Sequence, residues 1–162
     1  MPKLTHVEKF RAIALSSLKI KLLMLLKLPM AFLSGISINQ LNEQSCHTLI
    51  RFKWLNQNPF KSIYFACLGM AAELSTGALA MMYVYGIKPS VSMLVLSMKA
   101  DFTKKAIGKI RFECNDGELM KEAVHQAILT KEGQTVEVKS TGIDEKGDIV
   151  ATFLFTWTFK SK

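Results

Sequence analysis

Glu73 is the side chain in this sequence best suited to acid–base or nucleophilic chemistry. It is the only acidic residue between Lys61 and Asp101, and it lies within an apolar stretch at residues 63–84. A carboxylate in such surroundings is costly to desolvate unless it is hydrogen-bonded, paired or protonated. The same surroundings raise its pKa, which suits a base that works near neutral pH. Two interpretations stay open: Glu73 performs chemistry, or it is bonded to a neighbouring strand or loop.

The residues expected to share a helical face with Glu73 are nearly all small. Side chains three or four positions apart lie on one face of a helix. Here that face consists of Ala66, Gly69, Glu73, Thr76, Gly77 and Ala80. A face of small residues leaves a groove or permits the close approach of a second backbone. We expect the carboxylate of Glu73 to project into that space.

The helix that carries Glu73 is expected to form the centre of the fold. Residues 63–84 are apolar almost all round, which predicts a helix that is buried on most sides. Gly86 predicts its C-terminal end. Residues 35–53, which precede it, show the alternation typical of two short strands.

Four strands interrupted by one short helix are predicted after the central helix. The predicted strands are residues 91–102, 106–114, 134–141 and 149–159, and the helix runs from 117 or 118 to about 130. This order predicts an α+β fold in which one antiparallel sheet wraps around a central helix. We expect residues 31–162 to form this single domain.

Residues 1–30 are expected to add a basic amphipathic helix that packs on the domain. The apolar residues from Val7 to Leu28 recur at three- and four-residue steps, and Pro29 ends the helix. The face predicted to pack includes Leu18, Leu22 and Leu25. Lysines interrupt the most apolar part of this segment, so neither a spanning helix nor a signal peptide is expected. Peripheral contact with a membrane surface is the alternative that this interpretation does not favour.

Charge and cysteine usage narrow the function classes further. The net charge of +8 is compatible with nucleic acid, an anionic membrane or a phosphorylated small molecule. The sequence has no signature of a nucleic-acid-binding module, so no nucleic-acid partner is expected. Its three cysteines form no CxxC motif and do not cluster with its histidines, so no metal site is expected. Free cysteines fit a reducing, cytoplasmic compartment.

The loop before the central helix and the helix itself resemble a known family. Asn58-Pro59, Tyr64-Phe-Ala and the segment Ala71-Ala-Glu-Leu-Ser-Thr-Gly-Ala78 are similar to the central-helix region of hotdog-fold thioesterases. The similarity is greatest to the phenylacetate-pathway type and to an uncharacterised branch of that superfamily. Those enzymes carry an Asn in the loop, a His-Gly-Gly at the helix start and an acid nine residues after the His. The matching positions here are Asn58, Tyr64 and Glu73, and the resemblance covers about residues 30–160.

This resemblance implies a hotdog fold and the hydrolysis of an acyl-CoA or related acyl thioester. Glu73 would be the general base or nucleophile, and Asn58 would orient water or substrate. The remaining implied residues are Tyr64 and Thr76 as catalytic side chains, Phe65 and Ala66 as backbone oxyanion donors, and Gly69, Ser75 and Gly77 in substrate binding. No cofactor is implied beyond coenzyme A as part of the substrate. The resemblance also implies a homodimer, or a dimer of dimers, with the site between subunits.

The sequence departs from the family motif at the start of the helix. Tyr64-Phe65-Ala66 replaces His-Gly-Gly. The backbone N–H groups survive this replacement and can still donate to an oxyanion. The added side chains crowd the approach, which favours the alternative of a non-catalytic acyl- or lipid-binding hotdog protein.

Overall fold

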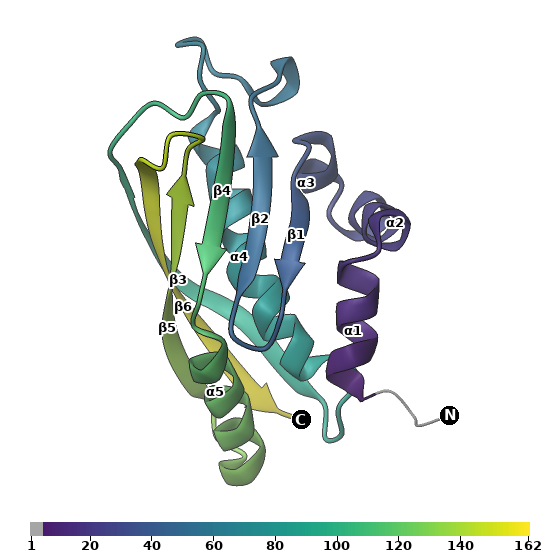
Figure 1. Ribbon diagram of the computed structural model, residues 1–162. Coiled ribbons are helices and arrows are strands. Elements are labelled where there is room, and N and C mark those ends of the chain that lie inside the picture. Colours follow the sequence, from purple (N-terminus) through teal and green to yellow (C-terminus); the bar gives the residue numbers. More distant parts are fainter. Residues whose placement is uncertain (1–4) are drawn as a thin grey trace.

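Residues 5–162 are described by the computed structural model shown in Figure 1. Its helices are α1 (His6–Ala14), α2 (Ser17–Lys27), α3 (Pro29–Leu33), α4 (Phe65–Val84) and α5 (Gly117–Thr130), with a 3₁₀ turn at Trp54–Asn56. Its strands are β1 (Ser37–Leu41), β2 (Cys46–Arg51), β3 (Val91–Phe102), β4 (Lys109–Cys114), β5 (Gln134–Ile143) and β6 (Ile149–Ser161). The predicted order of elements is confirmed, apart from the N-terminal helix, which divides into three.

The six strands form one antiparallel sheet in the order β1-β2-β4-β5-β6-β3. Figure 1 shows this sheet curving around α4. Alternation along β6 directs Phe153, Phe155, Trp157 and Phe159 inward, where all four are buried. These aromatic side chains pack the sheet against the central helix, which confirms the predicted α+β class.

The central helix α4 is the hydrophobic centre of the molecule. Twelve of its 20 residues are buried, because the helix is apolar around its whole circumference. By length and composition alone it would be able to cross a membrane, but 61% of its most apolar window is buried inside the fold. The first helical residue is Phe65, with Tyr64 as the capping residue. Thr48 on β2 ties the helix to the sheet by donating to the carbonyl of Ala71 at 2.7 Å.

The N-terminal segment packs on the domain with a different face from the one predicted. Leu15 ends α1, so α2 turns away from the line of the first helix, and Pro29 starts α3. The buried side chains are Phe10, Ala14, Ile20, Met24 and Ala31. The expectation for the leucine face was wrong: Leu18, Leu22 and Leu25 are exposed. Both faces of α2 are apolar, so periodicity alone did not identify the one that packs.

The two edges of the sheet have different surroundings. Figure 1 shows α1 and α3 beside the β1 edge. The other edge is β3, which pairs only with β6 among residues 5–162. Large exposed apolar side chains lie along β3, namely Leu94, Leu96, Met98 and Phe102. A long edge strand with free backbone groups and exposed apolar residues is a template for pairing with another chain.

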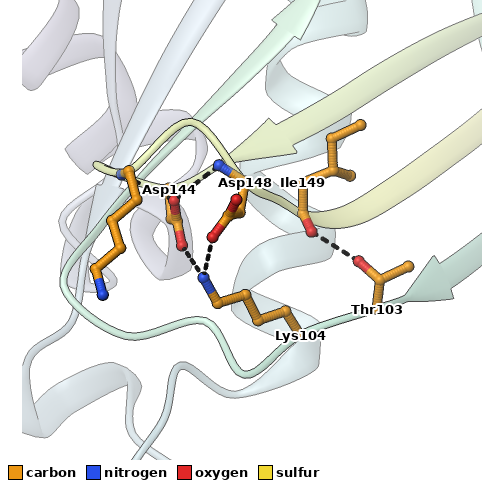
Figure 2. Close-up of polar contacts among 6 residues, drawn as sticks. Thr103, Lys104, Asp144, Asp148 and Ile149 are labelled. Carbon is orange, nitrogen blue, oxygen red and sulfur yellow. Dashed lines mark hydrogen bonds and ion pairs between the residues drawn. The ribbon is translucent and has the colours of Figure 1, made fainter.

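A small ion-pair cluster joins the connection after β3 to the β5–β6 turn. Lys104 Nζ lies 2.7 Å from Asp144 Oδ2 and 2.6 Å from Asp148 Oδ2, as Figure 2 shows. Thr103 adds a bond from its hydroxyl to the carbonyl of Ile149 at 2.7 Å. Hydrogen bonding to the two carboxylates raises the pKa of Lys104. The hydrogen bond that Lys104 donates is the main cause of the lowered pKa of Asp144. These contacts fix the loop that follows β3 at one end of α4.

Candidate active site

Glu73 lies at the wall of apolar cavities between α4 and the N-terminal helices. Two adjoining cavities, of about 360 Å³ and 250 Å³, both include Glu73, Leu74 and Lys27 in their linings. The larger one is closed by side chains from α1, α2, α4, β1 and β3, among them Phe10, Ile20, Leu23, Met24, Ile38 and Met93. The predicted space beside Glu73 therefore exists, and its opposite wall comes from the N-terminal helices.

Glu73 is half-buried, and its carboxyl group is partly removed from water. Among residues 5–162 it has neither a hydrogen bond to its oxygens nor an ion pair. Burial raises the pKa of this carboxyl group above its ordinary value. The backbone carbonyl of Glu73 accepts a hydrogen bond from Thr76 Oγ1 at 3.0 Å. The structural interpretation of Glu73 required a bonded carboxylate, and the described residues supply no such bond.

The hydroxyl groups of Ser75 and Thr76, which were predicted to assist Glu73, form hydrogen bonds that pack α4 against the sheet. Thr76 Oγ1 accepts a bond from Trp157 Nε1 at 3.1 Å while donating to Glu73. Ser75 Oγ donates to the carbonyl of Ala72 at 2.7 Å and lies 2.8 Å from Ser140 Oγ. Both residues are fully buried. They fix the helix to the sheet and do not line the cavities beside Glu73.

The predicted face of small residues divides into two sides. Gly77 lines the larger cavity with Glu73. Gly69 instead faces the sheet, where a Cβ at its position would contact the Phe153 ring at 3.7 Å. Of the two glycines predicted to contact substrate, the structure therefore brings only Gly77 next to Glu73.

A separate cavity of about 510 Å³ lies at the N-terminal end of α4. Asn58, Tyr64 and Phe65 line it together with Phe102 and Lys104. The amide of Asn58 organises the loop: its Nδ2 donates to Ser62 Oγ at 3.0 Å, and its Oδ1 accepts from the N–H of Phe60 at 2.9 Å. The predicted orienting Asn and the predicted helix start are thus brought together.

The start of α4 has the free backbone donors that an oxyanion site needs. Within residues 5–162, the N–H groups of Phe65 and Ala66 have no hydrogen-bond partner, as is normal for the first residues of a helix. The Tyr64 side chain is 44% exposed, and its ring meets that of Phe65 edge-on at 4.8 Å. Phe65 in turn contacts Phe102 edge-on at 6.3 Å. Aromatic rings therefore surround the donors where the family motif has glycines.

The two halves of the predicted site do not meet within one chain. Phe65 and Glu73 are eight residues apart, which corresponds to about 12 Å along the helix axis. The cavity at the helix start and the cavities beside Glu73 share no lining residue. Sequence reasoning missed the contribution of α1 and α2 to the site. The available signal was the spacing of four between Ile20 and Met24.

Of the basic residues that could meet the phosphates of coenzyme A or simply be solvated strand charges (Lys99, Lys104, Lys105, Lys109 and Arg111), three have acidic neighbours. Lys104 contacts two aspartates, Lys109 lies 3.9 Å from Glu145, and Arg111 pairs with Glu113. Lys105 is exposed in the same loop as Lys104 and lines the cavity at the helix start. Among residues 5–162, no three His, Cys, Asp or Glu side chains are grouped so that they could hold a metal ion.

Known proteins share this fold over nearly the whole chain. The model of a family described as "Domain of unknown function (DUF4442)" matches residues 17–159. No curated protein sequence matches the chain significantly. A Pseudomonas aeruginosa protein of unknown function, described as a probable thioesterase, superposes with a TM-score of 0.72 at 21% identity, covering 100% of this chain and 99% of its own.

Two further solved structures extend this likeness. A protein of unknown function from Chlorobaculum tepidum has a TM-score of 0.75 at 13% identity, covering 90% of this chain and 94% of its own. A thioesterase from Haemophilus influenzae has a TM-score of 0.59 at 12% identity, with coverages of 99% and 93%. The fold is therefore the hotdog fold, as the sequence resemblance implied.

Proposed function

Because the chain belongs to the DUF4442 family and has a hotdog fold, we propose that it hydrolyses acyl thioesters, with acyl-CoA as the substrate class. The observation that carries this proposal is Glu73: a half-buried carboxyl group that has no polar partner within residues 5–162 and lies beside an apolar cavity. Its fold neighbours include a Haemophilus influenzae protein described as a thioesterase. A carboxylate with a raised pKa is a suitable proton acceptor close to neutral pH.

Glu73 would act on water or directly on the thioester. As a general base, it takes a proton from water while the oxygen attacks the acyl carbon, and the C–S bond then breaks. The proton passes from Glu73 to the departing thiolate, so the products are a carboxylic acid and a free thiol. As a nucleophile, Glu73 would attack the acyl carbon to form a mixed anhydride while the C–S bond breaks and the thiolate leaves. Water then hydrolyses the anhydride, which releases the carboxylic acid, frees Glu73 and supplies the proton for the thiol.

The oxyanion donors would come from the start of α4, at the backbone N–H groups of Phe65 and Ala66. Free N–H groups and the positive end of the helix dipole stabilise a developing negative charge. Since these donors lie about 12 Å from Glu73 along one helix, the proposal requires the helix start of a second copy. Asn58 and the Tyr64 hydroxyl would then orient water or substrate from the same side.

A homodimer formed along β3 would supply that second copy. β3 is an edge strand with unpaired backbone groups, and Leu94 and Leu96 are exposed on it. Pairing of two β3 strands would join the sheets and cover these side chains. A dimer of dimers remains compatible with the same contact.

The acyl group would occupy the cavity of about 360 Å³ beside Glu73. Its walls are apolar side chains, which suit a hydrocarbon chain. The carrier thiol would lie toward the cavity at the helix start, where exposed Lys105 can meet a phosphate. Lys104 is less available, because two aspartates hold its ammonium group.

A second function, binding acyl chains without hydrolysis, has its own supporting observation. The rings of Tyr64 and Phe65 lie at the helix start, where the family motif has a histidine and a glycine. They narrow the approach of a carbonyl to the backbone donors. In that case the cavity would hold an acyl group, while Glu73 would have no chemical role.

We place the protein in the cytoplasm. Its three cysteines are buried and unpaired. Burial raises the pKa of Cys114 to about 12, so this thiol stays protonated and unreactive. Free cysteines are typical of a reducing compartment.

A panel of acyl-CoA esters with detection of the released thiol tests the proposed hydrolysis. The expected result is saturable release that depends on acyl length. Binding of the same esters, measured by calorimetry without any thiol release, would establish the binding function instead. If the protein neither releases thiol from nor binds any ester of the panel, both proposed functions are contradicted.

A further inference from the structure

The helix α2 presents leucines to solvent on the side opposite its packed face. Its buried residues are Ile20 and Met24. At about 100° per residue, one strip of the helix lies opposite these two. This strip consists of Leu18, Leu22, Leu25 and Leu26, which we call the leucine stripe. Their exposed fractions are 79%, 55%, 48% and 68%, respectively.

Lysines border the leucine stripe on both sides. By the same helical spacing, Lys19 lies along one border and Lys21 along the other, with Lys27 at the end of the helix. All three are exposed, and within residues 5–162 none forms an ion pair. Residues 5–33 contain five basic side chains and one acidic side chain, Glu8. Glu8 is held by Thr5 in the cap of α1.

Further exposed apolar side chains lie next to α2 along the chain. Leu15 and Leu28 flank the helix, and Met30 and Leu33 lie on α3; all four are exposed. Single exposed leucines are ordinary, but a contiguous apolar surface with a charged rim marks an interaction site. The central helix α4 presents no such surface, because most of its apolar residues are buried in the core.

We propose that the leucine stripe docks this protein on an anionic lipid bilayer. α2 would lie parallel to the surface, with its leucines at the boundary between headgroups and acyl chains. Lys19 and Lys21 would extend sideways to the lipid phosphates, with their aliphatic stems over the leucines. Each lysine near an anionic bilayer adds electrostatic attraction. This inference does not depend on hydrolysis by Glu73.

The charges favour a lipid surface over a second copy of the chain. A two-fold contact through the leucine stripe would bring Lys19 and Lys21 close to the same lysines of the partner. Like charges brought together along the borders of an interface disfavour such a contact. An anionic bilayer supplies both the apolar layer and the opposite charge.

Co-sedimentation of the full-length protein with vesicles tests the proposal. Vesicles of phosphatidylcholine alone are compared with vesicles of phosphatidylcholine and phosphatidylglycerol, at low and at high salt. We expect binding to the mixed vesicles to be stronger by about tenfold or more, and to weaken as salt rises. This measurement on the unaltered chain requires no variant to fold. Absence of binding to the mixed vesicles at low salt would overturn the proposal.

Paired variants assign the binding to the leucine stripe. Leu22→Ser with Leu26→Ser should lower vesicle binding by at least about tenfold, and Lys19→Gln with Lys21→Gln by about tenfold. The matched control is Leu119→Ser with Leu129→Ser, which removes two exposed leucines of α5 and should leave binding unchanged. Unchanged binding in the leucine-stripe variant would overturn the proposal. So would a change in its mass in free solution, because the leucine stripe would then cover a second copy.

Discussion

The carboxylate of Glu73 occupies the space above Gly77, one helical turn later. A Cβ built on Gly77 would lie 2.8 Å from Glu73 Oε1 and 3.4 Å from the ring of Trp157. The missing side chain thus gives the carboxylate its position between the helix surface and the cavity. Gly77 is conformationally ordinary, so the need for glycine here arises from space and not from backbone angles.

Gly77→Ala should move the carboxylate with little change in stability. The methyl group displaces Glu73 Oε1 and contacts Trp157 tightly, whereas alanine favours the helix by about 1 kcal/mol. We expect the free energy of unfolding to change by less than about 1 kcal/mol and thioester turnover to fall. Gly69→Ala is the control for helix propensity, because its methyl group would meet only Phe153 at 3.7 Å. Wild-type turnover in Gly77→Ala would show that catalysis does not depend on the position of the Glu73 carboxylate.

Glu73→Gln should abolish hydrolysis while preserving the fold. Glutamine has nearly the same shape but cannot accept the proton, and loss of a general base lowers a rate by about 10²–10⁴-fold. Thiol release is measured for the variant and for Glu137→Gln, a change at an exposed carboxylate on β5. Wild-type turnover in Glu73→Gln would defeat the catalytic assignment. A large fall in its melting temperature would indicate a structural role instead.

The raised pKa of Glu73 predicts how stability depends on pH. Because its folded pKa lies above the ordinary value of 4.5, the native state binds more protons than the unfolded state between the two values. Its favourable contribution is complete below 4.5 and is lost as pH rises through the folded pKa. In urea unfolding, the free energy of unfolding of the wild type should therefore fall relative to that of Glu73→Gln as pH rises across that window. A constant difference would show that the pKa is not raised.

The rate of thioester hydrolysis should depend on the ionisation of Glu73 in the opposite sense to stability. The base form is the ionised carboxylate, so activity should rise as pH increases through the folded pKa. A rate profile that is flat through the window located by unfolding would exclude Glu73 as the base.

Leu94→Lys should dissociate the proposed dimer. Leu94 is exposed on the edge strand β3, and a two-fold contact along β3 would bring two introduced lysines close together. Light scattering should give twice the chain mass of 18.2 kDa for the wild type and the mass of one chain for the variant. Leu119→Lys on α5 controls for the added charge. A wild-type monomer at micromolar concentration would contradict the β3 dimer.

Deleting residues 1–28 should destabilise the domain strongly. The deletion removes Phe10, Ile20 and Met24 from the core, and each contributes about 1.5–3 kcal/mol of hydrophobic free energy before entropy is subtracted. Deleting only residues 1–4 is the control, because it retains the Thr5 cap of α1. Thermal melts compare the two truncations with the full chain. A normal melt after removal of residues 1–28 would show that these helices add nothing to the fold.

The long elements were predictable from sequence because their patterns are strong and local. α4 is apolar all round, and β6 alternates over its whole length, so each has one arrangement that buries its apolar residues. The partial burial of Glu73 followed from its position inside that helix. The packed face of α2 did not follow, since Ile20 and Met24 compete with an equally apolar row of leucines. The division of the motif between separate cavities did not follow either, because their walls come from segments that are distant in sequence.

The cavity beside Glu73 has walls from segments that lie far apart along the chain. The carboxylate belongs to α4, whereas Phe10 belongs to α1, ahead of the residues 17–159 that the family shares. The size of the cavity is therefore set jointly by the N-terminal helices and by the sheet, which contributes Ile38 and Met93. A smaller side chain at position 10 would enlarge the cavity and weaken the core together, so ligand fit and the stability of the fold are linked at this residue.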